Sequence, residues 1–322
     1  CTNAQGHGPA WQNSLFEDNA EFGLGMKIGS DRARETVANL MTAALDCDKC
    51  PDEVKALFRQ WLENKENGEI TREIADKVVP LMENTDCPHC KKLLDYKHFI
   101  PARSQWIFGG DGWAYDIGFG GVDHVLASGQ DVNIMVFDTE VYSNTGGQSS
   151  KATPTGAIAQ FAAGGKEVKK KDLASIAMSY GYVYVAQIAM GADYNQCVKA
   201  IAEAEAYPGP SLVIAYAPCI NHGIKVGMSK AQTEEKLAVE AGYWHTFRYN
   251  PALKAEGKAA FSLDSKAPTG DYKAFLNGEV RYNALARFNP ERAEELFAKS
   301  EETAKERYEY LNKLITLYGG EN

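Results

Sequence analysis

Several features that would suggest a membrane or nucleic-acid protein are missing from this sequence. It has no apolar run near the ~20 residues that span a bilayer, and its N-terminus has neither the charged start nor the apolar core of a signal peptide. It also lacks a basic excess, because 34 Lys and Arg stand against 43 Asp and Glu for a net charge of −9. We therefore expect a cytoplasmic globular protein that binds neither a membrane nor nucleic acid.

The chain also lacks internal repeats, low-complexity tracts and an initiator methionine. It begins at Cys1, which suggests a processed product or a piece of a longer polypeptide. Its 322 residues are enough for one large α/β domain or two smaller ones.

Four of the seven cysteines form two CxxC pairs, CDKC (Cys47–Cys50) and CPHC (Cys87–Cys90). Paired CxxC motifs are typical of a structural metal site such as Zn²⁺, or of a cluster. Residues 51–86 make the separation long for a zinc ribbon, so disulfides and free thiols stay open as alternatives. We expect Cys197 on a buried helix face.

The pattern along the chain changes three times. We predict an extended segment over 1–30, a helical insertion over 31–100 that carries the CxxC pairs, an α/β core over 101–245, and a tail over 246–322. A long charged helix from about Pro290 to Leu317 is expected in the tail.

Strand and helix patterns alternate within the predicted core. Runs rich in β-branched and aromatic residues predict strands at 104–108, 132–137, 182–187 and 211–216. The segments between them predict helices at 118–128, 155–163, 171–180 and 193–206. This alternation indicates an α/β fold with a mostly parallel sheet and helices on both faces, whose ligands bind beyond the carboxyl ends of the strands.

Polar residues follow two of these strands. The segment IFGGDGW puts Asp111 among glycines, which allow close backbone approach or positive φ. The next strand ends in DTEVYSN, residues 138–144. Carboxylate, hydroxyl and carbonyl oxygens are the ligands that Mg²⁺ takes when it also holds phosphate oxygens. We therefore expect a Mg²⁺ and diphosphate site here, the alternative being an ordinary turn with an Asp cap.

GDG followed about thirty residues later by Asn after the next strand is the pattern of thiamine-diphosphate enzymes. Here Ser143-Asn144 stands where that pattern usually has two Asn. The long motifs within 110–129, 138–156, 180–186 and 208–219 resemble a narrower family, the pyruvate:ferredoxin (flavodoxin) oxidoreductases. The chain looks like the C-terminal, thiamine-diphosphate-binding third of such an enzyme.

The resemblance implies a set of site residues. Asp111, Thr139 and the Val141 carbonyl would bind Mg²⁺, and Asn144 would also reach the reacting carbon as the catalytic residue. Cys219 would be the last of four cysteines that hold a [4Fe–4S] cluster. The implied contacts to the cofactor are Gly110, Asp111, Gly112, Trp113, Thr139, Glu140, Val141, Tyr142, Ser143 and Asn144.

The resemblance also implies the reaction. Pyruvate and coenzyme A would give acetyl-CoA and CO₂, with electrons leaving through iron–sulfur clusters to ferredoxin or flavodoxin. The other cluster cysteines and the Glu that protonates the aminopyrimidine lie before Cys1 in the family, so the upstream part of the same enzyme is an expected partner, as is a second copy in a homodimer. The alternatives are a non-oxidative thiamine-diphosphate enzyme and a non-catalytic packing fragment.

Three further features have two interpretations each. His7 lines the cofactor pocket or is a structural hydrogen-bonding group, and His222 tunes the cluster or is structural. The basic run Lys169–Lys171 is a solvated helix start or a docking patch for an acidic ferredoxin.

Overall fold

The computed structural model describes residues 17–320, which divide into two compact units. Residues 17–22 and 106–320 belong to the first unit, and residues 23–105 form the second. Cys1 and His7, on which two of the expectations fall, lie outside the described residues.

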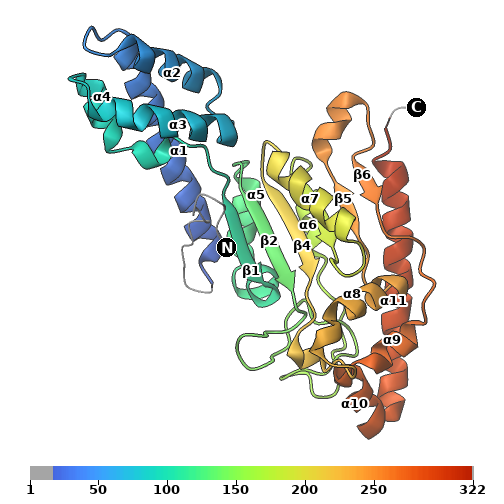
Figure 1. Cartoon of the computed structure of the whole chain (residues 1–322). Helices are drawn as coiled ribbons and strands as arrows, with labels where there is room; N and C mark the ends of the chain where they lie inside the picture. Colours follow the sequence, from blue (N-terminus) through green and yellow to red (C-terminus); the bar gives the residue numbers. More distant parts are fainter. Residues whose placement is uncertain (1–16, 321–322) are drawn as a thin grey trace. The chain divides into compact units, whose positions relative to one another are not determined.

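The second unit is helical (Figure 1). Its core is built from apolar residues at helical spacing, among them Phe58 and Trp61, both almost fully buried. The indole N–H of Trp61 donates to the Ile100 carbonyl at 2.8 Å, which ties the end of the unit to its core. Its helices are α1 (Asn19–Leu45) from Gly23 onward, α2 (Asp52–Glu63), α3 (Gly68–Glu83), α4 (Pro88–Leu94) and the 3₁₀ turn η1 (Lys97–Phe99).

The expected extended segment over residues 1–30 is wrong from Asn19 onward, where α1 begins. Glycines in this stretch lower the helix propensity by about 1 kcal/mol each and hide the helical pattern. Ala20 and Leu24 are nevertheless buried one turn apart, so packing outweighs propensity. The predicted helical insertion corresponds to the second unit.

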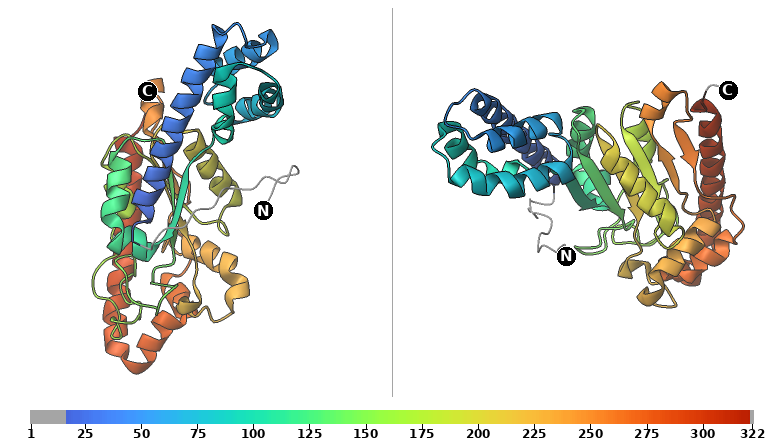
Figure 2. Two further views of the ribbon diagram at one scale, coloured as in Figure 1. Left: turned by 90° about the vertical axis from the view of Figure 1, so that its left-hand side faces the viewer. Right: turned by 45° about the horizontal axis from the view of Figure 1, so that its top comes forward.

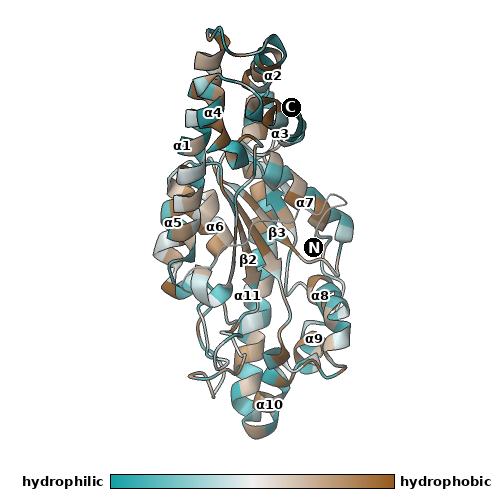
Figure 3. Cartoon of the chain, turned by 60° about the vertical axis from the view of Figure 1, so that its left-hand side comes forward, coloured by the Kyte–Doolittle hydropathy of each residue, from teal (hydrophilic) through white to brown (hydrophobic). Residues whose placement is uncertain are grey.

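A six-stranded sheet forms the centre of the first unit, in the order β1-β2-β4-β3-β5-β6. The first four strands in that order are parallel, whereas β5 is antiparallel to β3 and to β6. The strands are β1 (Trp106–Gly110), β2 (Asn133–Asp138), β3 (Tyr184–Ile188), β4 (Ser211–Tyr216), β5 (Phe247–Tyr249) and β6 (Phe261–Leu263). Figure 3 shows how apolar the central strands are, as parallel strands buried on both faces must be.

Helices cover both faces of this sheet. Helix α7 (Tyr194–Ala206) packs on one face through Cys197, Ala200 and Ala204, which confirms the expected core position of Cys197. Figure 2 (left) shows the green α5 (Phe119–Ala127) on the side of the sheet opposite to α7. The remaining elements are η2 (Gly112–Ile117), α6 (Leu173–Met178), η3 (Ile220–His222), η4 (Met228–Lys230), α8 (Ala231–Glu240), η5 (Pro251–Glu256), α9 (Tyr272–Gly278), α10 (Val280–Phe288) and α11 (Pro290–Leu317).

The α/β class with a mostly parallel sheet is confirmed, but two details of the expectation are wrong. Residues 155–163 form no helix, because their backbone bonds to other segments: Gln160 N–H donates to the Gly147 carbonyl and Gly156 N–H to that of Lys166. The core also extends past residue 245, since β5 and β6 join the sheet. Three-residue strands are too short to show a pattern in sequence.

Within residues 17–320, no helix has both the length and the apolar character needed to cross a membrane.

Candidate functional site

The site lies at the carboxyl ends of three adjacent parallel strands. Asp111 directly follows β1, Thr139 follows β2, and Cys219 comes three residues after β4. Because β2 pairs with both β1 and β4, the topology brings these three residues to one edge of the sheet. Ligands of open α/β sheets bind at this edge.

Three oxygens expected to bind Mg²⁺ meet at this edge. The Thr139 hydroxyl oxygen lies 2.8 Å from Asp111 Oδ1 and 2.9 Å from the carbonyl oxygen of Val141. The sequence did not point to Ser150, whose hydroxyl donates to Asp111 Oδ2 at 2.6 Å. Carboxylate, hydroxyl and carbonyl oxygens are the donors that Mg²⁺ prefers, so this set fits a magnesium ion. Their role as ligands stays a prediction.

Burial controls the charge state of Asp111. This residue is 1% exposed, and burial, helped by the nearby charge of Asp138, raises its pKa to about 7. Hydrogen bonds from Ser150 and Thr139 lower the pKa of Asp111, but by less than burial raises it. A cation bound beside Asp111 would lower this pKa and favour the ionised carboxylate, which is the form that binds a metal.

The glycines around Asp111 serve mainly to make room. None of Gly109, Gly110 and Gly112 has a positive φ. A Cβ on Gly112 would lie 2.4 Å from the Tyr142 ring, and one on Gly109 would lie 2.2 Å from the Trp113 ring. Gly110 is the exception, since the one neighbour within 4 Å of its Cβ position is the Phe137 carbonyl oxygen. Gly109 and Gly112 are therefore explained by the close approach of aromatic rings to the backbone, and none of the three glycines is explained by a positive φ.

Trp113 belongs to η2, a π-helical turn that starts directly after Asp111. Its indole is 1% exposed and packs over Gly118, where a Cβ would lie 2.1 Å from the ring. The indole nitrogen is buried without a hydrogen-bond partner among residues 17–320. π-Helical turns occur frequently at functional sites, and this one carries Gly112 and Trp113 beside the predicted diphosphate.

The loop after Val141 is held in shape by Gln148. The backbone N–H of Tyr142 donates to the Gln148 carbonyl at 3.0 Å. The side-chain oxygen of Gln148 accepts from Gly146 N–H at 3.0 Å and from the Thr145 hydroxyl at 2.7 Å. The structure leaves Ser143 half-buried and Asn144 exposed in this loop, so Asn144 is accessible to a ligand.

Glu140 lies between two predicted ligands and has φ +59°, a left-handed conformation that is rare for a residue other than glycine. Its carboxylate binds Lys170 at 2.9 Å and Arg281 at 2.8 Å, and accepts the Tyr243 hydroxyl at 2.5 Å. Its carbonyl oxygen accepts from the Thr153 hydroxyl at 2.6 Å. These bonds occupy the Glu140 side chain, which thereby supports the predicted metal loop, residues 139–144. The contact of Glu140 with the diphosphate stays a prediction.

A buried ion network therefore underlies the site. Burial alone would raise the pKa of Glu140, but the charges of Lys170 and Arg281 outweigh it and hold that pKa at about 2. Arg281 also binds Glu279, at 2.7 Å. Lys170 also binds Asp138, at 2.7 Å. Nothing in the sequence pointed to these residues, because a network of partners that are distant along the chain leaves no local pattern.

The basic run Lys169–Lys171 is not a solvated helix start. Only Lys169 forms an exposed ion pair, with Glu306. The side chain of Lys170 is 23% exposed and bridges two carboxylates, which compensate for its desolvation. Lys171 donates to the Tyr115 carbonyl at 3.0 Å, and burial, together with the nearby charge of Lys151, lowers its pKa to about 8.

His222 connects the Cys219 turn to the metal loop. Its Nε2 lies 2.7 Å from the carbonyl oxygen of Thr139, and its Nδ1 lies 3.5 Å from Glu279 Oε1. The Cys219 thiol is buried and accepts from the backbone and side-chain N–H groups of Asn221, at 3.5 and 3.6 Å. N–H donors to sulfur are among the features that tune iron–sulfur ligands.

The two CxxC pairs lie together in the second unit. The thiol groups of Cys50, Cys87 and Cys90 are within 4.8 Å of one another, and none of the four cysteines is in a disulfide. Within residues 17–320, Cys50, Cys87 and Cys90 are the one group of three or more His, Cys or carboxylate side chains whose ligand atoms lie this close together, and Cys219 is not part of it.

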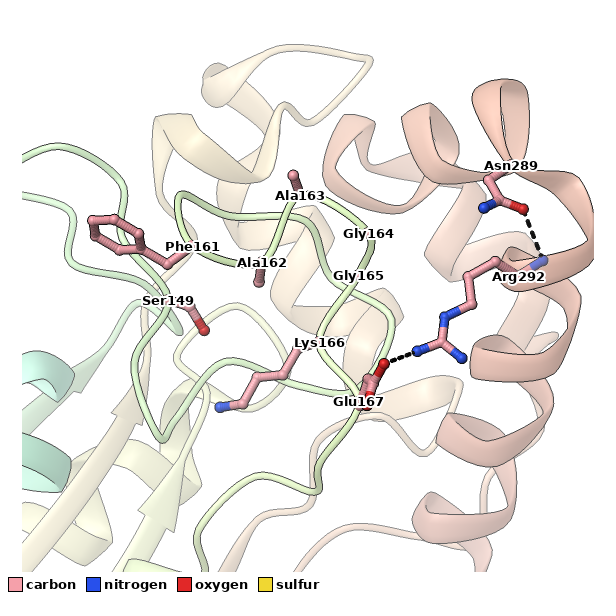
Figure 4. Close-up of a pocket in the computed structure, with 10 residues that line it drawn as sticks. All are labelled: Ser149, Phe161, Ala162, Ala163, Gly164, Gly165, Lys166, Glu167, Asn289 and Arg292. Carbon is pink, nitrogen blue, oxygen red and sulfur yellow. Dashed lines mark hydrogen bonds and ion pairs between the residues drawn. The ribbon is translucent and has the colours of Figure 1, made fainter.

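Two cavities lie near the sheet edge. The smaller, about 290 Å³, is lined by Glu140, Val141, His222 and Arg281 among others, and so adjoins the predicted metal loop. The larger, about 580 Å³, lies between residues 161–167 and the start of α11 (Figure 4). Figure 4 shows the Arg292–Glu167 ion pair at its border. No predicted site residue lines this larger cavity.

Comparison with known families identifies the class of this domain. Residues 94–215 match the thiamine pyrophosphate enzyme, C-terminal TPP binding domain. This stretch contains β1, β2 and the predicted metal loop, so the chain contains a thiamine-diphosphate-binding domain.

The relatives identify the family more narrowly. The chain is 59% identical over 315 residues to the pyruvate-flavodoxin oxidoreductase of Klebsiella pneumoniae, which covers 97% of this chain and 27% of that protein. It is 54% identical over 319 residues to the pyruvate:ferredoxin oxidoreductase of Moorella thermoacetica, again over 97% of this chain and 27% of the relative. By sequence the chain belongs to the pyruvate:ferredoxin (flavodoxin) oxidoreductases, and it spans about a quarter of their length. The resemblance inferred from the motifs is confirmed.

Among solved structures, a 2-oxoglutarate:ferredoxin oxidoreductase from Magnetococcus marinus matches with 24% identity and a TM-score of 0.34, over 36% of this chain and 40% of that one. A likeness this small supports no argument.

Proposed function

We propose that this chain supplies the Mg²⁺ and diphosphate half of a thiamine-diphosphate site in an enzyme that oxidises pyruvate. One observation carries the proposal: the Thr139 hydroxyl lies within 2.9 Å of both the Asp111 carboxylate and the Val141 carbonyl. This donor set, at the carboxyl ends of two parallel strands, suits an octahedral cation that shares its remaining positions with phosphate oxygens.

The residues present have separate tasks in this proposal. Asp111, Thr139 and the Val141 carbonyl hold Mg²⁺, while the backbone of residues 110–113 and of the loop 139–144 surrounds the diphosphate. Asn144, which is exposed in this loop, would contact the reacting carbon of the bound cofactor. When bound, thiamine diphosphate serves as the electron sink for decarboxylation of a 2-oxo acid, and the protein orients and shields it.

The oxidative branch of the proposal rests on Cys219. Its turn is linked to the metal loop through the 2.7 Å contact between His222 and the Thr139 carbonyl, so a cluster on this thiolate would lie near the proposed cofactor site. A [4Fe–4S] cluster takes four thiolates, and the other three would come from sequence outside residues 17–320. A nearby electron acceptor favours an oxidoreductase over a non-oxidative thiamine-diphosphate enzyme.

The similarity to pyruvate-flavodoxin and pyruvate:ferredoxin oxidoreductases supports a proposal for the complete reaction. Pyruvate and coenzyme A are the proposed substrates, acetyl-CoA and CO₂ the products, and ferredoxin or flavodoxin the electron acceptor, in a cytoplasmic homodimer. The two relatives are named for different acceptors, flavodoxin and ferredoxin, while sharing 59% and 54% identity with this chain. This stretch alone therefore does not determine the acceptor.

The first test is Asp111→Asn in the full-length protein. It should abolish Mg²⁺-dependent binding of thiamine diphosphate, because the metal loses its charged ligand. Calorimetric titration with the cofactor in the presence of Mg²⁺ measures this loss. The matched control is Asp95→Asn, which removes an exposed carboxylate of the second unit that pairs with Lys92. Unchanged affinity in Asp111→Asn would refute the assignment.

A further inference from the structure

The second unit has an unusual core, because cysteines lie at its centre. Cys50, Cys87 and Cys90 are 4%, 0% and 0% exposed and belong to the same buried cluster as Phe58 and Trp61. Their three sulfurs all lie within 4.8 Å of one another. This grouping comes from two segments distant in sequence, the CDKC turn before α2 and the CPHC turn at the start of α4.

The separation of two of these sulfurs matches one kind of site. Cys50 Sγ and Cys90 Sγ are 3.8 Å apart. A tetrahedral Zn²⁺ with Zn–S bonds of about 2.3 Å separates its sulfur ligands by about 3.8 Å. A disulfide would need about 2.05 Å. A cubane cluster binds each thiolate to a different iron at the corners of a larger cage, which requires wider spacing than this.

Hydrogen bonds hold both turns in a ligating shape. The Cys50 backbone N–H donates to the Cys47 carbonyl at 3.1 Å, which closes the first turn. The thiol of Cys87 accepts from the backbone N–H groups of His89 and Cys90, as a thiolate bound to a metal does at a CxxC turn. These N–H donors would stabilise negative charge on the sulfur.

Thr85 joins the two turns. Its hydroxyl donates to the Lys49 carbonyl at 2.9 Å and accepts from the Cys87 backbone N–H at 3.2 Å. The structure therefore holds the CDKC and CPHC turns face to face through a contact that involves no cysteine side chain.

Cys47, the fourth cysteine of the two pairs, lies outside this group of three sulfurs but packs against the same buried cluster. It is partly exposed and its thiol hydrogen-bonds to that of Cys87. We infer that Cys47, Cys50, Cys87 and Cys90 bind one structural Zn²⁺ in the second unit. The site is closed by four thiolates, leaves no position for a substrate, and stabilises a small helical unit whose two loops it joins. The inference does not depend on the proposed function.

The experiment measures zinc in the purified full-length protein by elemental analysis and Zn X-ray absorption. We expect about one zinc ion per chain with four sulfur neighbours at about 2.3 Å. Cys87→Ser should lose this zinc. Cys197→Ala is the matched control, because Cys197 is also buried but lies on α7 in the first unit, and it should keep the zinc.

Cys47→Ser provides a second variant in case Cys87→Ser does not fold, since Cys47 is the one partly exposed member. It should lower the zinc content and reduce the hydrogen-exchange protection of peptides within residues 23–105, without changing exchange of the sheet. Protein without zinc, disulfides mapped by mass spectrometry between these cysteines, or zinc unchanged in both variants would overturn the inference.

Discussion

Glu140 combines two costly features in one residue. Its positive φ costs of order 1 kcal/mol or more, and its carboxylate is almost fully buried. The conformation turns the Val141 carbonyl toward the Thr139 hydroxyl, 2.9 Å away. Arg281 and Lys170 hold the carboxylate in place and keep its pKa near 2. The conformation of the predicted metal loop thus depends on residues outside the proposed ligand set.

Arg281→Met tests this support. Removing one partner of a buried ion pair leaves Glu140 and Glu279 without their shared cation and should destabilise the region by about 3–5 kcal/mol. We expect weaker binding of Mg²⁺ and thiamine diphosphate and faster hydrogen exchange over residues 139–150. Arg292→Met, which breaks ion pairs whose carboxylates are largely exposed, should change stability by no more than about 1 kcal/mol. Wild-type cofactor affinity in Arg281→Met would contradict the supporting role.

His245, which lies outside the predicted metal site, should make the stability of the protein depend on pH. It is 3% exposed, and burial, followed by the charge of Arg307, lowers its pKa to about 4 from an ordinary value of 6.5. Tyr308, also on α11, packs its ring 5.5 Å from the imidazole. Because the folded-state pKa is depressed, the stability that His245 contributes is complete above pH 6.5 and is lost as the pH falls toward 4.

The stability lost on protonation of His245 should reach at most about 3 kcal/mol. Hydrogen exchange of β5 in the full-length protein, measured across this pH range, gives the local free energy of opening. His245→Phe should flatten the profile, because the variant has no imidazole to protonate. An equally steep profile in the variant would assign the effect to other groups.

At the scale of elements, the turn from β1 into η2 positions Asp111 through packing. Gly112 allows the Tyr142 ring to lie against the backbone, and the Tyr142 hydroxyl donates to the Gly112 carbonyl at 3.2 Å. The β1 turn and the metal loop after β2 are therefore in direct contact. The two loops can lie this close because Gly112 has no side chain.

Gly112→Ala should push the two loops apart, because the added Cβ would lie 2.4 Å from the Tyr142 ring. Overpacking of this kind costs about 1–3 kcal/mol, and we expect lower cofactor affinity although no ligand has been removed. Gly120→Ala in α5 is the control, since nothing lies within 4 Å of its Cβ position. It should be neutral or stabilise the helix by up to about 1 kcal/mol. Cofactor titration measures the affinity and thermal unfolding measures the stability. If both variants show the same affinity and stability, the contact between Gly112 and the Tyr142 ring does not position the two loops.

At the scale of the whole molecule, the chain carries parts of two sites that differ in completeness. The proposed zinc site has all four thiols within the second unit. Cys219 has no such set within residues 17–320, and the chain spans 27% of the length of its two named relatives. The proposed cluster at Cys219 would take its other ligands from sequence outside residues 17–320.

Cys219→Ser in the full-length protein should remove or disturb one [4Fe–4S] cluster, with a loss of up to about four iron atoms per chain. Iron analysis and electron paramagnetic resonance measure this, and electron transfer to ferredoxin should slow. Binding of thiamine diphosphate through Asp111 should persist, because the two sites use different residues. Unchanged iron content would remove Cys219 from the cluster, and Cys197→Ala again serves as the control.

The sequence by itself determined what depends on neighbours along the chain. Alternating strand and helix patterns predict the four parallel strands and the long helix from Pro290 to Leu317, because periodicity is a local signal of burial. Extended motifs around Asp111 and Thr139 identified the cofactor class, and the CxxC spacing singled out four cysteines, three of which lie together in the structure.

Only the tertiary structure decided what depends on distant partners. Residues 155–163 have a helical composition but bond to residues 147 and 166, and β5 and β6 are strands because β3 offers them an edge. Lys170 is indistinguishable from Lys169 in sequence, yet it alone bridges Asp138 and Glu140. Long-range ion pairs and close approaches leave no periodic trace in sequence, since their energy comes from residues that only folding brings together.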